Sequence, residues 1–139
     1  MSRAVFVDTS AWYALADSGD TFHSQAVQRL RRLLDEGRAL VTTNHIAGET
    51  YTLLRVRLDS ATAQDFLRRI RGSAFTQRVF VPEAWEEAAE DLLLQYGDQG
   101  LSYVDATSFI AMRRLRLQEA FAFDRHFAVL GFTLVGDES

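Results

Sequence analysis

Short apolar runs alternate with longer amphipathic segments along the chain. The short runs predict strands at residues 4–7, 39–41, 79–81, 120–123 and 132–135. The longer segments keep apolar residues at helical spacing and predict helices at residues 10–17, 21–36, 44–58, 60–70, 82–96 and 103–115. Strands that are separated by helices pair in parallel through right-handed crossovers. The pattern therefore predicts an α/β fold with a central parallel sheet, and we expect one domain over residues 1–139.

Two of the predicted strands run into an aspartate, Asp8 after the first and Asp124 after the fourth. In open parallel sheets, ligands bind outside the carboxyl ends of the strands. Each aspartate alone is explained equally well as the polar residue that ends a strand or caps the next helix. Their positions therefore make Asp8 and Asp124 candidates for a ligand-binding site, but do not distinguish this role from a structural one.

Two further carboxylates lie on the apolar faces of predicted helices. Glu49 shares a stripe with Ile46 and Leu53, where a carboxylate is costly unless it is paired or binds a cation. A glutamate that reaches solvent from the edge of the stripe, or pairs with an arginine, explains the position as well. Asp105 follows Ser102 by three residues, which is the spacing of a capping box, and it also heads an inward-facing stripe. These two interpretations of Asp105 are compatible.

Taken together, four inward carboxylates would repel one another unless a cation lay between them. Oxygen ligands of this kind select Mg²⁺ or Mn²⁺ over zinc. A divalent cation that activates water and neutralises charge on a phosphate is suited to hydrolysing phosphodiester bonds. The set of four therefore favours a metal-dependent nuclease more strongly than any single member does.

Composition removes several other chemistries. The chain has no cysteine, and all fifteen of its basic residues are arginine, so thiol, Schiff-base and phosphate-loop lysine chemistry are excluded. No Gly-x-Ser-x-Gly elbow is present for a serine hydrolase, and we interpret His45 and His126 as peripheral. No apolar run approaches the roughly 20 residues that span a bilayer, so we expect a cytoplasmic protein with no membrane association. The net charge of −4 opposes passive RNA binding, but a bound cation would invert the local charge.

The four carboxylates and their surroundings resemble the PIN-domain nucleases, especially the VapC toxins of toxin–antitoxin pairs. The matching segments are Val7-Asp8-Thr9-Ser10-Ala11-Trp12, Ala47-Gly48-Glu49-Thr50, Leu101-Ser102-Tyr103-Val104-Asp105-Ala106 and Phe123-Asp124-Arg125-His126-Phe127. The four segments occur in the family's order and spacing, and together they extend over nearly the whole chain. Where many relatives carry Thr or Ser two residues before the last aspartate, this chain has Ala122.

The resemblance implies a three-layer α/β/α fold whose central parallel sheet has about five strands. It implies that Asp8, Glu49, Asp105 and Asp124 are catalytic and bind Mg²⁺ or Mn²⁺, with Ser10 in support. Water would attack the RNA and leave a 5′-phosphate and a 3′-hydroxyl.

The same resemblance implies an RNA substrate, a small antitoxin partner and a homodimer. Trp12 and Arg125 are candidates for RNA contact, although the helical spacing of Trp12 suits the core equally well. Two other hypotheses stay open: a PIN nuclease of RNA processing that has no antitoxin, and a PIN-like module that binds RNA or protein without cutting.

Overall fold

The computed structural model describes residues 3–136 of the chain. Within this range lie five strands, β1 (Val5–Val7), β2 (Leu40–Thr43), β3 (Thr76–Val79), β4 (Glu119–Phe121) and β5 (Thr133–Leu134). The same range holds seven helices, α1 (Thr9–Ala16), α2 (His23–Asp35), α3 (Asn44–Arg57), α4 (Ser60–Gly72), α5 (Glu83–Gln95), α6 (Tyr103–Leu115) and α7 (His126–Val129). All strand pairs are parallel, which confirms the predicted α/β fold.

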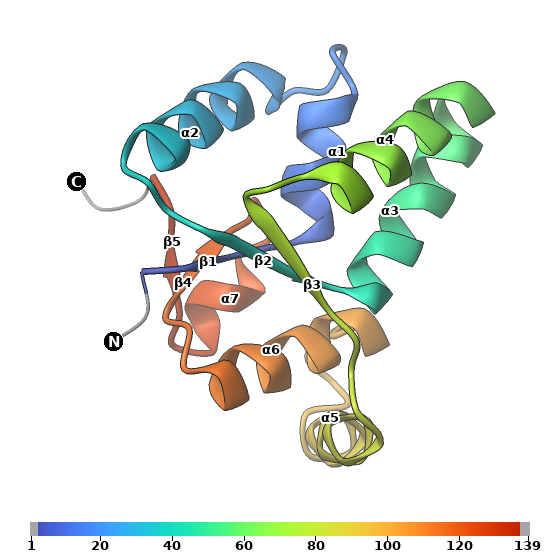
Figure 1. The fold of residues 1–139 in the computed structure, drawn as a ribbon. Coiled ribbons are helices and arrows are strands. Elements are labelled where there is room, and N and C mark those ends of the chain that lie inside the picture. The colour runs from blue at the N-terminus through green and yellow to red at the C-terminus, as the bar shows by residue number, and fades with distance from the viewer. Residues whose placement is uncertain (1–2, 137–139) are drawn as a thin grey trace.

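The strands lie in the order β3-β2-β1-β4-β5, so β1 is central although it comes first in the chain (Figure 1). After β1 the chain adds β2 and then β3 on one side, and it then adds β4 and β5 on the other side. The direction of building therefore reverses between β1 and β4. At such a reversal the loops that leave the two strands diverge, and the carboxyl edge of the sheet opens into a crevice.

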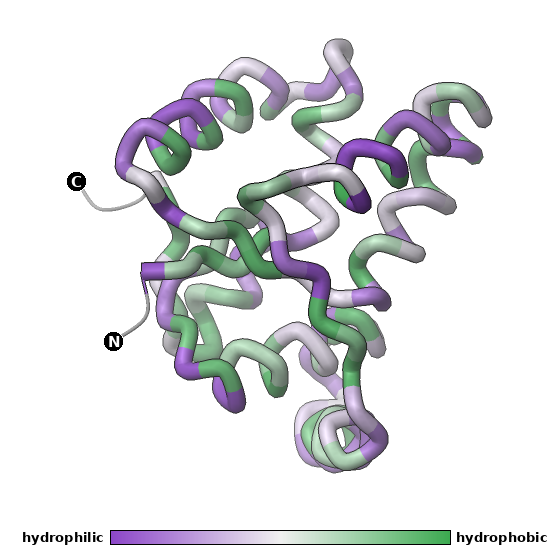
Figure 2. The backbone as a smooth tube through the Cα atoms, in the orientation of Figure 1, coloured by the Kyte–Doolittle hydropathy of each residue, from purple (hydrophilic) through white to green (hydrophobic). Residues whose placement is uncertain are grey.

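Helices cover both faces of the sheet, and the side chains of β1 show this most clearly. Val5 and Val7 point to one face and pack with α1 and α2, whereas Phe6 points to the other face and packs with α5, α6 and α7. All three are fully buried, because successive side chains of a strand alternate between faces and here neither face meets water. Figure 2 shows the result as apolar strands at the centre and mixed helices around them.

Helices α3 and α4 form a pair that begins beyond the carboxyl end of β2 (Figure 1). Leu54 and Phe66 from this pair pack against Tyr13 of α1 in a third apolar cluster. The pair therefore fixes one wall of the edge where the strands end. Across residues 3–136, no helix combines the length and the apolar character needed to cross a membrane.

The structure differs from the sequence prediction at two short elements. Strand β3 lies at Thr76–Val79 rather than at residues 79–81, and Phe80, which follows it, is 65% exposed. The N–H of Val81 pairs with the side chain of Asn44 instead of a neighbouring strand. Helix α7 was not predicted, because its four residues are too few to show a helical period.

Candidate active site

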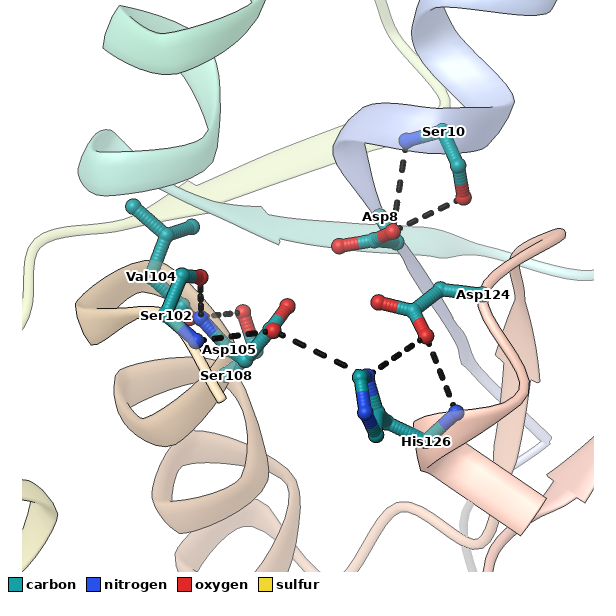
Figure 3. Close-up of polar contacts among 8 residues, drawn as sticks. All are labelled: Asp8, Ser10, Ser102, Val104, Asp105, Ser108, Asp124 and His126. Carbon is teal, nitrogen blue, oxygen red and sulfur yellow. Dashed lines mark hydrogen bonds and ion pairs between the residues drawn. The ribbon is translucent and has the colours of Figure 1, made fainter. Parts of the chain in front are cut away.

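Three of the four predicted carboxylates converge at the carboxyl edge of the sheet, where the strand order reverses. Asp8 follows β1 and caps α1, Asp124 follows β4, and Asp105 lies in the first turn of α6. Figure 3 shows their carboxylates turned toward a common space. Because β1 and β4 are adjacent parallel strands, residues that follow their carboxyl ends must come close together.

Asp8 is buried, with only 4% of its surface exposed. Its Oδ2 accepts hydrogen bonds from the Ser10 N–H at 3.2 Å and from the Ser10 hydroxyl at 2.8 Å. Burial raises the pKa of Asp8 to about 7, although the Ser10 hydrogen bonds act in the opposite direction, and repulsion from Asp105 and Asp124 raises it further. Without a cation, the folded protein therefore binds a proton at Asp8 near neutral pH.

Ser10 connects the two loops that carry Asp8 and Asp124. Its hydroxyl donates to Asp8 and accepts a hydrogen bond from the N–H of Phe123 at 2.9 Å. Phe123 immediately precedes Asp124, so this hydroxyl adds a side-chain link to the backbone pairing that already joins the two strand ends. The structure thus places Ser10 where a supporting residue is needed.

Asp105 takes part in a complete capping box with Ser102. Its Oδ2 accepts from the Ser102 N–H at 3.1 Å, and the Ser102 hydroxyl accepts from the Asp105 N–H at 3.0 Å. Burial nevertheless raises the pKa of Asp105, and repulsion from Asp124 adds to this effect. The cap and the position in the cluster coexist, because one carboxylate serves the helix end while facing the other aspartates.

His126, interpreted as peripheral from the sequence, lies inside the cluster. Its Nδ1 is 2.9 Å from Oδ1 of Asp124 and 4.0 Å from Oδ2 of Asp105 (Figure 3). Its backbone N–H donates to the same Asp124 oxygen at 2.9 Å. An aspartate whose side-chain oxygen accepts from the N–H two residues later is common just before a helix. In the sequence, Asp124 is therefore the one local feature that could have indicated that α7 follows.

Asp105, Asp124 and His126 each offer an atom that could hold a metal ion, and these three atoms lie within 4.8 Å of one another. Nδ1 of His126 is buried and has no hydrogen-bond partner among the described residues, because its short contact with Asp124 lacks hydrogen-bond geometry. A buried nitrogen without a hydrogen bond, beside the carboxylate oxygens of Asp105 and Asp124, is a surrounding that a divalent cation would satisfy. The residues present therefore fit a divalent cation.

Glu49 lies on α3 and is not a member of that compact group. It lines an open hollow beside the site together with His45 of the same helix and Val104, the residue before Asp105. His45 forms an ion pair with Glu86 at 2.7 Å and lies near the ring of Tyr103. The three aspartates do not line this hollow, so the structure places Glu49 in a neighbouring hollow rather than among them.

The two candidates for RNA contact lie in different surroundings. Trp12 donates its indole N–H to Thr42 at 3.2 Å and packs edge-on against Phe66. It lines a second, largely apolar groove between α1, α2 and α4, whose lining includes none of the four carboxylates. Arg125 is exposed and directly follows Asp124.

The PIN domain family model matches residues 5–133. The 23S rRNA-specific endonuclease VapC20 of Mycobacterium tuberculosis, from two strains, is 38% identical over 134 residues, which is 96% of this chain and 99% of VapC20.

The chain is a PIN-domain protein of the VapC type.

A crystal structure of Mycobacterium tuberculosis VapC20, described as a sarcin–ricin loop cleaving toxin, is also similar in fold. It superposes with a TM-score of 0.84 at 37% identity and covers 94% of this chain and 97% of that one. The family model contains the whole candidate site, from Asp8 to Asp124. The resemblance found in the four sequence segments is therefore confirmed.

The buried Asp8 gives the first testable prediction. The unfolded chain releases the Asp8 proton near the ordinary value of 3.8, whereas the folded chain releases it at about 7. Between these values the folded state binds more protons, so the stability contributed by Asp8 falls as the pH rises from about 4 to about 7. Asp8→Asn removes this loss and keeps an oxygen that accepts from Ser10. In EDTA at pH 8 the variant should be more stable by on the order of a few kcal/mol, and near pH 4 the difference should vanish.

Urea unfolding at both pH values measures this difference. Asp59→Asn is the matched control, because Asp59 also caps a helix, but its hydrogen bond from the Thr62 N–H lowers its pKa. The control variant should not gain stability at pH 8. An Asp8→Asn variant that is less stable than wild type at pH 8 would show that the carboxylate is structural.

Proposed function

We propose that this protein is a metal-dependent endoribonuclease and the toxin of a toxin–antitoxin pair. The observation that carries the proposal is the convergence of Asp8, Asp105 and Asp124 at the reversal of strand order in a PIN-domain protein. Burial, with a smaller contribution from the neighbouring carboxylates, raises the pKa of Asp8 and of Asp105, which is the electrostatic mark of a site built for a cation. The 38% identity to a 23S rRNA-specific endonuclease supports structured ribosomal RNA as the first substrate to test.

In this proposal Asp8, Asp105 and Asp124 hold a Mg²⁺ or Mn²⁺ ion, and Glu49 approaches from the adjoining hollow through a water. The ion would lower the pKa of a bound water and neutralise charge that develops on the phosphate. Ser10 fixes the orientation of the Asp8 carboxylate. Asp8 is withdrawn from water, which strengthens the electrostatic interactions of its carboxylate. Hydrolysis by water leaves a 5′-phosphate and a 3′-hydroxyl.

The function is tested by incubating purified protein with ribosomal RNA and with a hairpin oligonucleotide in Mg²⁺, Mn²⁺ or EDTA. Wild type should cut in either metal and not in EDTA, and Asp105→Asn should lose more than about 100-fold of the rate. Asp91→Asn, the same change at an exposed aspartate of α5, should retain the wild-type rate. Equal activity in Asp105→Asn and wild type would place the chemistry elsewhere. Folded, metal-bound wild type that cuts neither RNA would instead favour a binding module.

The apolar groove supports a protein partner as well. Leu30 and Leu34 of α2 face Phe66 and Ile70 of α4 across it, and Trp12 lines it from α1. We propose that a segment of a small antitoxin lies in this groove and that the active protein is a homodimer. An apolar groove bounded by helices is a common receptor for such a segment.

A substitution in the groove separates partner binding from catalysis. Leu34→Glu places a charge on the groove wall and should abolish neutralisation by the proposed antitoxin, while RNA cleavage stays at the wild-type level. Leu94→Glu is the matched control, because Leu94 is 85% exposed on α5 and lies outside the groove. Growth during co-expression and pull-down of the two proteins report the outcome. If the antitoxin still neutralises the Leu34→Glu variant fully, the antitoxin does not bind in this groove.

A further inference from the structure

Among the described residues, His126 is the histidine that reaches the carboxylate cluster. The position of its Nδ1 is that of a possible metal ligand. Its Nδ1 is buried, whereas the side chain as a whole keeps 36% of its surface exposed. The exposed remainder of the side chain lies open to water. A histidine that ligates a metal has this arrangement, with one nitrogen on the ion and the other satisfied by a second partner.

The distances around Nδ1 match a coordination shell. When metal–ligand bonds are about 2.1 Å long, adjacent ligands of an octahedral ion lie about 3 Å apart and opposite ones about 4 Å apart. Nδ1 lies 2.9 Å from the Asp124 oxygen and 4.0 Å from the Asp105 oxygen. The contact with Asp124 is an ion pair when the imidazole is protonated, but Nδ1 has no hydrogen-bond partner among the described residues.

Helix α7 explains why the ring is aimed inward. The His126 backbone N–H is held by Asp124 Oδ1, and the next residue, Phe127, is fully buried among Phe6, Phe109 and Phe132. These two anchors fix the first turn of α7 against the sheet. The imidazole direction is therefore set by the fold, as a ligand position requires.

We propose that Nδ1 of His126 is a direct ligand of the divalent cation, which makes the site a mixed nitrogen and oxygen set with Asp105 and Asp124. This inference rests on the proposed function only in taking the cluster as a cation site. Imidazole nitrogen is a poor ligand for Mg²⁺ and a better one for transition metals. The mixed set should therefore bind Mn²⁺ in preference to Mg²⁺.

Electron spin-echo spectroscopy of bound Mn²⁺ tests the proposal directly, because a coordinated imidazole nitrogen modulates the echo. The chain has three histidines, so three single variants assign the signal. Wild type should show nitrogen modulation, His126→Ala should lose it, and His45→Ala and His23→Ala should keep it. His45 is the closest control, since it also contacts a carboxylate, Glu86, beside the site.

Metal titration supplies the second measurement. His126→Ala should weaken Mn²⁺ binding by about tenfold or more and Mg²⁺ binding by much less. If the alanine variant does not fold, wild type grown with ¹⁵N-histidine shows whether a histidine is bound, because the modulation must change with the nitrogen isotope, and modulation retained in His23→Ala and His45→Ala then assigns it to His126. Wild-type protein that binds Mn²⁺ without nitrogen modulation, or modulation that survives in His126→Ala, would overturn the proposal. Either result leaves the nuclease function intact, since RNA cleavage is measured separately.

Discussion

The burial of Asp8 beside two further carboxylates is the constraint on which the site depends, and repulsion from Asp105 and Asp124 adds to its cost. Asp8, Asp105 and Asp124 come from three different elements, yet the fold turns them toward one space and withdraws Asp8 almost wholly from water. In that state a carboxylate must be protonated, paired or bound to a cation. The pKa of about 7 at Asp8 shows that the protein side chains alone leave the charge incompletely compensated.

The scaffold keeps these side chains in place against their repulsion. Packing of β1 between two helical layers fixes the strand end that carries Asp8. The Ser10 hydroxyl then ties that end to the backbone just before Asp124, and the capping box ties Asp105 to the start of α6. The neighbouring carboxylates lower the stability of the folded state, and the apolar packing around them offsets this cost, as is common at functional sites.

Periodicity was sufficient to predict the sheet apart from the position of β3, six of the helices and the positions of Asp8 and Asp124, because strand ends and apolar stripes are local properties of the sequence. Other features depend on tertiary packing. Helix α7 has only four residues and no period, so the inward direction of His126 was missed. The stripe that holds Glu49 indicates the face of α3 but not its distance from the aspartates. The burial that raises the pKa of Asp8 requires the whole fold.

The central claim is that a divalent cation relieves the repulsion among these carboxylates. The most direct test is the melting temperature of wild type and Asp8→Asn at pH 8, without metal and with increasing Mn²⁺. Without metal the variant should melt higher. High Mn²⁺ should raise the melting temperature of the wild type strongly and that of the variant little, so that the order reverses, because a ligand stabilises the folded state by RT ln(1 + [L]/Kd) and the variant binds the ion more weakly. Equal shifts in both proteins, or no shift in either, would contradict the account.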